Sequence, residues 1–465
     1  MKFRSITLLS LLVFAQSHAI NYQKYQANNP QNITIIGTGY VGLISGAGLA
    51  ACGHQVTCVD IIKEKVEKLN QGIMPIFEPG IQELVVDQMK AGRLSFTLDS
   101  KSAIGQADVI IIAVDTPMGE DGKADLRALT AVAKNIGANL NGFTVICTKS
   151  TVPLGTHLVV RDLVSSTNTS NSQFEIVSNP EFLREGTAII DLFERNPIIV
   201  GTDSIKAHEI MQAIYQPIID QGADFIATNN ATAEIIKYAW NTFLGVRIAY
   251  VNELAELCNA AQADVFQVIH GMSLGEKVYP TSKLKPGPGI GGSCLPKDTQ
   301  ALVRKADDLG IDLQMVKAFV SSNKKQKRNV VQHIYDLLDG AVEGKTIAIL
   351  GLAFKANTDD IRYSTAIPVI NKLLADGAHV SAYDPAAMEN MRQLYPDVTY
   401  CSTITQALKD ADAVVLITEW DEFKRIDLAQ VAQLVRSRNL FDGRNLWDPK
   451  ALKALNFNYR NLGRA

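Results

Sequence analysis

A glycine-rich turn near the N-terminus constrains the fold of this chain more than any other feature. Residues Asn32–Ile36 form an apolar run typical of a buried strand, and residues 37–42 follow it with the pattern GxGxxG. An apolar helix over residues 43–51 and a second strand over Gln55–Val59 are predicted next. The second strand ends at Asp60, eighteen residues after the last glycine. Strand, glycine turn, helix and terminal acid together indicate a Rossmann unit that binds a dinucleotide.

The same motif predicts which dinucleotide binds. Glycines allow the pyrophosphate to approach the backbone at the helix N-terminus, and an acid such as Asp60 accepts hydrogen bonds from the ribose hydroxyls. A carboxylate at this place repels the additional phosphate of NADP, so the sequence favours NAD. The alternative is a tight strand-to-helix turn without a ligand, which the complete set of features disfavours.

A second motif, GGSCLPKD over residues 291–298, places one cysteine where a turn gives way to a helix. Pro296 suits the first helical turn, and the positive end of the helix dipole is expected to lower the pKa of the Cys294 thiol. Asp298 lies four residues beyond Cys294, so both side chains face the same way if the helix continues. The motif alone fits two interpretations. Cys294 is either a catalytic nucleophile beside a carboxylate, or a buried structural cysteine at a helix cap.

Length and composition limit the classes of protein to which the chain can belong. Its 465 residues are enough for about three domains, and 47% hydrophobic with 20% charged residues suit ordinary globular cores. The formal net charge of -3 gives no electrostatic reason to bind nucleic acid. The six cysteines include no CxxC pair, so neither a disulfide framework nor a metal site is expected.

The N-terminus has the pattern of an export signal, in conflict with the predicted cofactor. Lys2 and Arg4 precede an apolar run over residues 6–15, and residues 17–19 resemble a small-residue cleavage site, so residues 1–19 read as a secretory signal. The run is too short for a membrane span. Because free NAD is abundant in the cytoplasm, we expect a cytoplasmic protein without a stable membrane partner, with export as the alternative.

The rest of the chain predicts an α/β fold of two Rossmann-like, doubly wound parallel sheets joined by a mainly helical central domain. Strands alternate with helices up to about Gly201, a helical stretch follows, and the strand–helix rhythm restarts with strands over Thr346–Leu350 and His379–Tyr383. The second unit lacks GxGxxG, so we expect it to bind something other than NAD, or nothing. We place a dinucleotide-binding domain at residues 31–205, a helical central domain at 206–335 and a third domain at 336–465.

These motifs, in this order, resemble those of the UDP-glucose 6-dehydrogenases within the UDP-glucose/GDP-mannose dehydrogenase family. The resemblance covers about residues 32–449 and implies a helical centre that dimerises, hence a homodimer or higher homo-oligomer. It implies NAD-dependent oxidation of UDP-glucose to UDP-glucuronate through a thiohemiacetal and a thioester on cysteine, and a place in nucleotide-sugar metabolism and polysaccharide biosynthesis. Further matching motifs are TP at residues 116–117, KSTVP at 149–153, NPEFLREG at 179–186 and KYAWN at 237–241.

The resemblance implies roles for six catalytic side chains. Cys294 attacks the aldehyde and carries the thioester. Lys237 and Asn241, four residues apart on one helix, point at one developing oxyanion. Asp298 through a water, or Lys237, deprotonates the sugar alcohol. Glu181 and Thr151 activate the hydrolytic water.

The resemblance also implies the binding residues, and it implies no metal site. Basic residues among those facing the substrate suit a diphosphate. The cofactor contacts fall at Gly37, Gly39, Tyr40, Val41, Gly42, Asp60, Lys65, Thr116, Thr151, Glu185, Lys297 and Arg362. The substrate contacts fall at Glu181, Phe182, Leu183, Lys237, Asn241, Lys285, Gly289, Gly291, Phe354, Lys355 and Arg444.

Some positions depart from the family's pattern. Ile290 replaces an aromatic residue, Tyr363 replaces a glutamate, and residues 277–279 (KVY) stand where many members have an arginine that reaches the sugar across the dimer. None of these changes removes a catalytic group, but they leave GDP-mannose or a UDP-N-acetylhexosamine open as the substrate. From another class, a non-catalytic NAD-binding protein is the alternative, which the intact catalytic set argues against.

Overall fold

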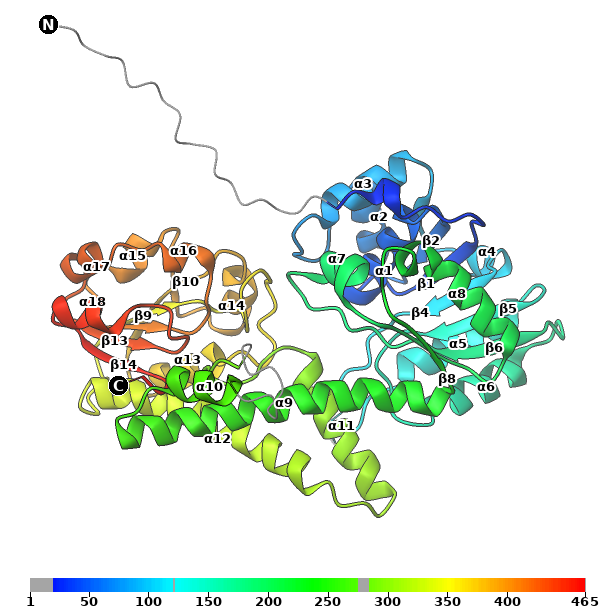
Figure 1. Ribbon diagram of the computed structural model, residues 1–465. Coiled ribbons are helices and arrows are strands. Elements are labelled where there is room, and N and C mark those ends of the chain that lie inside the picture. The colour runs from blue at the N-terminus through cyan, green and yellow to red at the C-terminus, as the bar shows by residue number, and fades with distance from the viewer. Residues whose placement is uncertain (1–19, 120–121, 275–283, 465) are drawn as a thin grey trace, which may run out of the picture.

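Two α/β lobes lie at the two ends of one long helix, α9 (Asn230–Ala261), in a computed structural model that describes residues 20–119, 122–274 and 284–464 (Figure 1). The two lobes stand on the same side of α9, with the other central helices beneath and between them. The described residues do not include residues 1–19, which resemble an export signal, or residues 277–279, which depart from the family's pattern.

The N-terminal lobe contains an eight-stranded sheet in the order β3-β2-β1-β4-β5-β6-β7-β8. The first six strands are parallel and follow the Rossmann order, whereas β7 runs antiparallel to β6. Because β8 pairs with β7, the sheet extends beyond the domain boundary that we drew at residue 205. The strands are β1 (Asn32–Ile36), β2 (Gln55–Val59), β3 (Leu94–Thr97), β4 (Val109–Ile112), β5 (Thr144–Thr148), β6 (Phe174–Ser178), β7 (Ile198–Gly201) and β8 (Phe225–Thr228).

Helices cover both faces of this sheet, and its strands β4, β5 and β7 are buried along their whole length. Successive side chains of β4 alternate between the two sides: Ile111 joins the core under one set of helices and Ile112 the core under the other. The helices of this lobe are α1 (Tyr40–Ala51), α2 (Lys63–Asn70), α3 (Ile81–Lys90), α4 (Ser100–Gly105), α5 (Arg127–Asn139), α6 (Thr156–Thr167), α7 (Ala188–Ile190) and α8 (Ile205–Ile219).

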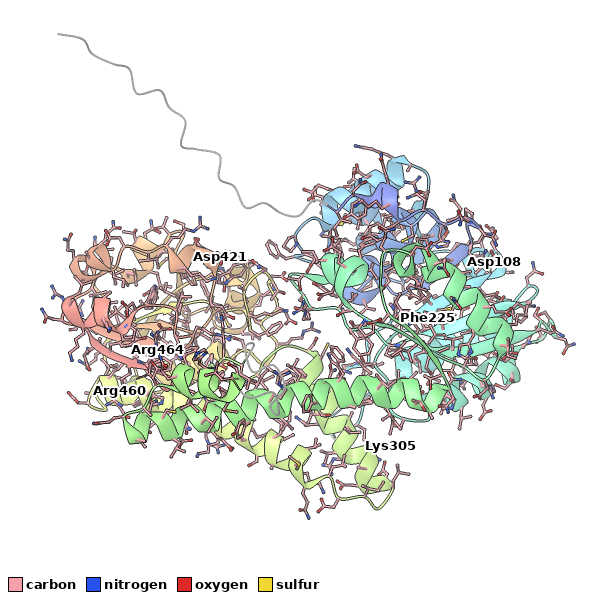
Figure 2. The ribbon with its side chains drawn as sticks, viewed as in Figure 1. Asp108, Phe225, Lys305, Asp421, Arg460 and Arg464 are labelled. Atoms are coloured by element: carbon pink, nitrogen blue, oxygen red, sulfur yellow. The ribbon has the colours of Figure 1, made fainter. Side chains whose placement is uncertain are left out.

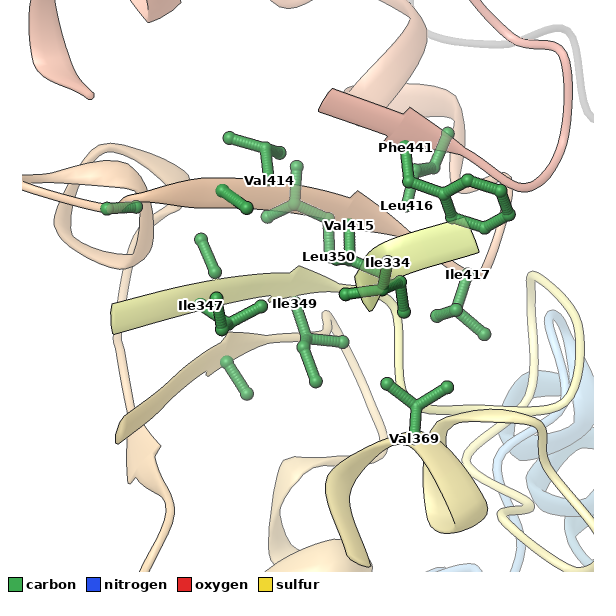
Figure 3. Packing of buried hydrophobic residues seen from close by; sticks show 14 of the residues in the cluster. Ile334, Ile347, Ile349, Leu350, Val369, Val414, Val415, Leu416, Ile417 and Phe441 are labelled. Carbon is green, nitrogen blue, oxygen red and sulfur yellow. The ribbon is translucent and has the colours of Figure 1, made fainter. Parts of the chain in front are cut away.

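The C-terminal lobe contains a six-stranded, wholly parallel sheet in the order β11-β10-β9-β12-β13-β14. Its core packs Ile347, Ile349 and Val415 of the sheet against Ile334 and Val369 of the covering helices (Figure 3). The elements are β9 (Thr346–Leu350), α13 (Ala366–Ala375), β10 (His379–Tyr383), α14 (Met388–Leu394), β11 (Thr399–Tyr400), α15 (Ile404–Leu408), β12 (Ala413–Leu416), α16 (Asp421–Lys424), α17 (Leu428–Leu434), β13 (Asn439–Asp442), α18 (Pro449–Ala454) and β14 (Asn458–Asn461).

The central helices connect the two lobes. Helix α9 packs on α11 (Cys294–Asp308) and α12 (Gln314–Leu337), and α10 (Val265–Ser273) lies beside its C-terminal end. Gly245 of α9 permits this packing, since a Cβ there would lie 2.5 Å from the Phe319 ring of α12. Arg460 of β14 pairs with Asp336 of α12 at 3.3 Å, which ties the last strand to the centre (Figure 2). None of the helices within the described residues has the length and apolar character needed to cross a bilayer.

Candidate active site

The glycine-rich turn between β1 and α1 has the shape that a dinucleotide pyrophosphate requires. Gly37 has a φ of +102°, and a Cβ there would lie 2.6 Å from the carbonyl oxygen of Ala113. A Cβ on Gly42 would overlap the carbonyl oxygen of Gly37. A Cβ on Gly39, by contrast, would meet only Asp115 Oδ1 at 3.8 Å, so open space faces the N-terminus of α1. Gly37 and Gly42 are therefore needed for the turn and its close packing, whereas Gly39 leaves room for a ligand.

Asp60 lies beside this turn with its carboxylate already ionised. It accepts hydrogen bonds from Thr38 N at 3.0 Å and Thr38 Oγ1 at 2.5 Å, from Ile62 N at 3.1 Å and from Lys65 Nζ at 2.9 Å. Partial burial opposes ionisation, but these donors outweigh it and lower the pKa of Asp60 to about 2. A fixed carboxylate at the end of β2 fits the ribose of NAD, as the sequence predicts.

A cavity of about 470 Å³ joins the glycine-rich turn to the cysteine motif. Its walls come from α1, from the loops after β4, β5 and β6, from the start of α11 and from the third domain. The loops leave the carboxyl ends of parallel strands, where ligands of doubly wound folds bind. The predicted site residues among its lining are Tyr40, Val41, Thr116, Thr151, Glu181, Leu183, Glu185, Cys294, Lys297 and Arg362.

A cluster of charged and amide side chains surrounds Cys294, the first residue of α11. Lys237 Nζ lies 3.3 Å from Glu181 Oε1, and Asn241 Nδ2 donates to Asp298 Oδ2 at 2.7 Å. Both Lys237 and Asn241 are buried on α9, one turn apart. They bind two different carboxylates here, whereas the sequence predicts that both point at one oxygen. Side chains from α9, α11 and the loop after β6 thus meet at one place.

The Cys294 thiol has a raised pKa, so the expectation of a lowered one is wrong. Its side chain is open to the cavity, and the surrounding protein displaces bulk water. This burial, followed by the charges of Asp298 and Glu181, raises the pKa of Cys294 to about 11, although Lys237 opposes the shift. Burial and these two charges act against the helix N-terminus: Asp298 belongs to the same motif, whereas Glu181 comes from the distant loop after β6, which the local motif does not reveal. Cys294 is therefore a neutral thiol at rest.

Lys237 carries a positive charge next to Glu181. Burial opposes that charge, but Glu181, Cys294 and Asp298 together raise the pKa of Lys237. The lysine is therefore an ammonium at neutral pH. A fixed cation beside the thiol can stabilise negative charge that develops on a substrate oxygen.

The cofactor side of the cavity also contacts the third domain. Glu185 accepts a hydrogen bond from Thr358 Oγ1 at 2.9 Å, and Arg362 lies 3.7 Å from the same carboxylate. Burial and the charge of Asp360 raise the pKa of Glu185 to about 7. These contacts bring Glu185 and Arg362 together, as the predicted cofactor site requires.

The sequence analysis missed Glu78, which holds the Glu185 loop against α1. The buried Glu78 carboxylate accepts hydrogen bonds from the Tyr40 hydroxyl, from Gly186 N and from Ala188 N. No local pattern marks it, because two of these partners are more than 100 residues away in the chain. An acid within the otherwise uncharged residues 71–80 was the one available signal.

The remaining predicted substrate residues are not part of the lining of this cavity, and three of them, Phe354, Lys355 and Arg444, belong to the third domain. Arg444 donates to the carbonyl oxygen of Phe354 at 3.0 Å and pairs with Glu419 at 2.7 Å. A Cβ on Gly291 would lie 2.7 Å from the carbonyl oxygen of Tyr363 and 2.8 Å from the Phe354 side chain, so only glycine fits there. The other predicted substrate residues absent from the lining of the main cavity are Phe182, Lys237, Asn241, Lys285, Gly289 and Lys355.

Comparison with known proteins gives consistent matches over most of the chain. Residues 31–219 match the NAD binding domain, 231–325 the central domain and 348–449 the UDP binding domain of the UDP-glucose/GDP-mannose dehydrogenase family. UDP-glucose 6-dehydrogenase TuaD of Bacillus subtilis is 42% identical, covering 93% of this chain and 93% of its own. UDP-glucose 6-dehydrogenase of Rhizobium meliloti is also 42% identical, covering 93% of this chain and 99% of its own.

Solved structures show the same similarity. A UDP-glucose dehydrogenase from Pyrobaculum islandicum superposes with a TM-score of 0.87 at 33% identity, covering 94% of this chain and 98% of its own. A UDP-D-ManNAc dehydrogenase from Pyrococcus horikoshii superposes with a TM-score of 0.81 at 27% identity, covering 93% and 99% of the two chains. The architecture of two Rossmann-like domains around a helical centre is therefore shared.

Proposed function

Because the chain belongs to the UDP-glucose/GDP-mannose dehydrogenase family, we propose that it oxidises UDP-glucose to UDP-glucuronate with NAD. The observation that carries the proposal is the single cavity shared by the glycine-rich turn, Glu181 and Cys294. A primary alcohol loses four electrons on the way to a carboxylate. Two NAD molecules are therefore reduced for each sugar, and the aldehyde between the two steps must be retained.

The residues of the N-terminal lobe fit NAD. The open space at Gly39 suits the pyrophosphate, and the ionised Asp60 suits the ribose hydroxyls. When bound, NAD accepts a hydride from the sugar carbon in each oxidation. Tyr40 and Val41 line the cavity that runs from this site towards Cys294.

We assign the base of the first oxidation to Asp298, acting through a water. The raised pKa of Lys237 keeps that lysine protonated, so it suits the stabilisation of an alkoxide better than the removal of a proton. Asp298 is fully buried and held by Asn241 and Lys297 at 2.7 Å each. It therefore reaches the alcohol through an intervening water.

Cys294 then prevents release of the aldehyde. Its sulfur forms a bond to the carbonyl carbon and the thiol proton passes to the carbonyl oxygen, whose developing negative charge lies near Lys237. The second oxidation converts this thiohemiacetal to a thioester. Water then attacks the thioester carbon, the carbon–sulfur bond breaks, and Glu181 and Thr151 position that water. The products are the carboxylic acid and the restored thiol.

We propose that the functional unit is a homodimer formed through α9. Several apolar side chains on α9 are exposed among the described residues, including Phe243 at 65%, Leu257 at 63% and Trp240. An exposed apolar row along a central helix marks an interface between proteins. The length of α9 and the lobes at its two ends suit a partner that is a second copy of the same helix.

We place the enzyme in the cytoplasm, since its cofactor is abundant there. Mass spectrometry of the mature protein tests this placement. An intact N-terminus supports it, and cleavage after Ala19 contradicts it.

The test of the activity is NADH formation by the purified protein with a panel of nucleotide sugars. Turnover with UDP-glucose as the preferred substrate is expected. Preference for GDP-mannose or a UDP-N-acetylhexosamine would keep the chemistry and reassign the sugar. Folded protein that binds NAD but oxidises none of the panel would support a non-catalytic NAD-binding protein.

A further inference from the structure

A second, much smaller cavity lies behind the wall of the main one. Ser150 and Thr151 line both cavities, so one layer of side chains separates them. The space open to the centre of a water molecule is about 10 Å³, which is room for about one water. Its other walls include Thr148, Ser178 and Lys237. The small cavity therefore reaches from the end of β5 to the catalytic lysine.

Two polar groups at this small cavity lack partners that a water would supply. Thr148 is 3% exposed, and its Oγ1 has no hydrogen-bond partner among the described residues. Within the same part of the chain, Lys237 Nζ donates to one acceptor, Glu181 Oε1, although an ammonium has three donors. Buried polar groups are normally hydrogen-bonded to protein or to ordered water.

The other polar groups of the wall are already fixed, so they can orient a water without moving. Ser178 Oγ donates to Asn230 Oδ1 at 2.9 Å, and Ser150 Oγ donates to the carbonyl oxygen of Val114 at 2.7 Å. The Glu234 carboxylate accepts hydrogen bonds from Gly155 N at 2.7 Å and from His157 N at 3.1 Å. A cavity with several polar partners and room for one molecule meets the requirements of a buried water.

We propose that this cavity stores the water that hydrolyses the thioester on Cys294, and that Thr148 positions that water. The proposal rests on the proposed function, which consumes one water per turnover after both oxidations. At that stage the cofactor and the nucleotide sugar occupy the main cavity, and bulk water is excluded. A water held next to Thr151 and Lys237 needs to move only past one side-chain layer to reach the thioester.

The hydrolytic step balances without any further reactant. The water oxygen bonds to the thioester carbon, and the carbon–sulfur bond breaks. One water proton passes through Glu181 to the departing sulfur, which restores the Cys294 thiol. The second proton remains on the product as the carboxylic acid. No electrons are transferred, so the step needs no oxidant.

The test is Thr148→Val, which keeps the shape of the side chain and removes its hydroxyl. In rapid mixing with UDP-glucose and NAD, the variant is expected to form two NADH per active site at the parent rate. Steady-state turnover then slows by up to about tenfold, the effect of losing one hydrogen bond of about 1.4 kcal/mol. Intact mass spectrometry of the quenched variant should show the uronyl adduct on Cys294. Thr148→Ser should restore turnover.

The matched control is Thr144→Val, the same change at the opposite end of β5, where the hydroxyl donates to the Ala107 carbonyl oxygen at 3.4 Å. Thr144→Val should leave both the initial NADH formation and the steady-state turnover unchanged. Slowing of the first NADH phase by Thr148→Val, or unchanged turnover, would overturn the proposal. A high-resolution crystal structure adds a readout that does not depend on the substrate. Water bonded to Thr148 Oγ1 supports the proposal, and an empty cavity overturns it even if the substrate is reassigned.

Discussion

Replacing Asp298 with asparagine is expected to make the Cys294 thiol more reactive and the enzyme slower. Burial, then Asp298, then Glu181 raise the pKa of Cys294 from 9.0 to about 11. Asp298→Asn removes the larger of the two carboxylate contributions, and the amide oxygen can still accept the hydrogen bond from Asn241.

Two opposing changes decide how much faster Cys294 is alkylated in Asp298→Asn. Loss of the neighbouring charge should lower the thiol pKa by about one unit, which raises the thiolate fraction about tenfold at a pH well below the pKa. Lower basicity makes each thiolate about threefold less nucleophilic, for a Brønsted coefficient of about 0.5. Alkylation should therefore be about threefold faster. Turnover should fall by at least about a hundredfold, because the general base is lost.

The assay is the rate of iodoacetamide labelling of the peptide that carries Cys294, followed by mass spectrometry across a series of pH values. In the parent enzyme this rate should rise about tenfold per pH unit, because the thiolate fraction grows in that way below the pKa. Lys237→Met is the matched opposite change, since it removes the cation that lowers the thiol pKa, and it should slow labelling. Labelling of Asp298→Asn at or below the parent rate would show that Asp298 does not raise the pKa of the Cys294 thiol. A parent thiol whose labelling rate levels off near neutral pH would contradict the raised pKa itself.

Three other variants test separate parts of the account. Cys294→Ala should abolish acid formation and leave NAD affinity unchanged in calorimetry, because the thiol contacts the sugar and not the ribose end of the cofactor; continued acid formation would contradict covalent catalysis. Asp60→Ala should weaken NAD binding by about 1.5–3 kcal/mol, the value of a hydrogen bond to a charged group, and reduce discrimination against NADP; an unchanged NAD affinity would remove Asp60 from the ribose site. If the protein forms the proposed dimer, Phe243→Asp should give a monomer in light scattering, since it places a charge among the exposed apolar side chains of α9; an unchanged mass would move the interface elsewhere.

The local elements of the fold were predictable because their signals are local. Apolar runs bounded by glycine and polar residues mark β1, β2, β9 and β10, and each strand has the predicted bounds. The reversal of β7 was not predictable in this way. A strand's direction depends on its connection and partners, and an apolar run reads the same in either direction.

The residues of the site were predictable from motifs, but their electrostatics were not. Cys294 and Asp298 share one motif, whereas the ion pair of Lys237 with Glu181 joins residues 56 positions apart. The pKa of Cys294 depends on that distant pair as well as on its own helix. The Thr148 hydroxyl has no sequence signal at all, since a threonine in a strand is ordinary.

In the proposed reaction, one enzyme carries the sugar through both oxidations, with the second on Cys294. The most direct measurement counts NADH formed and UDP-glucose consumed in the same reaction, with the product identified by mass spectrometry. Two NADH per UDP-glucose, with UDP-glucuronate as the product and no free aldehyde trapped, is the expected result. One NADH per sugar with a released aldehyde would contradict the account.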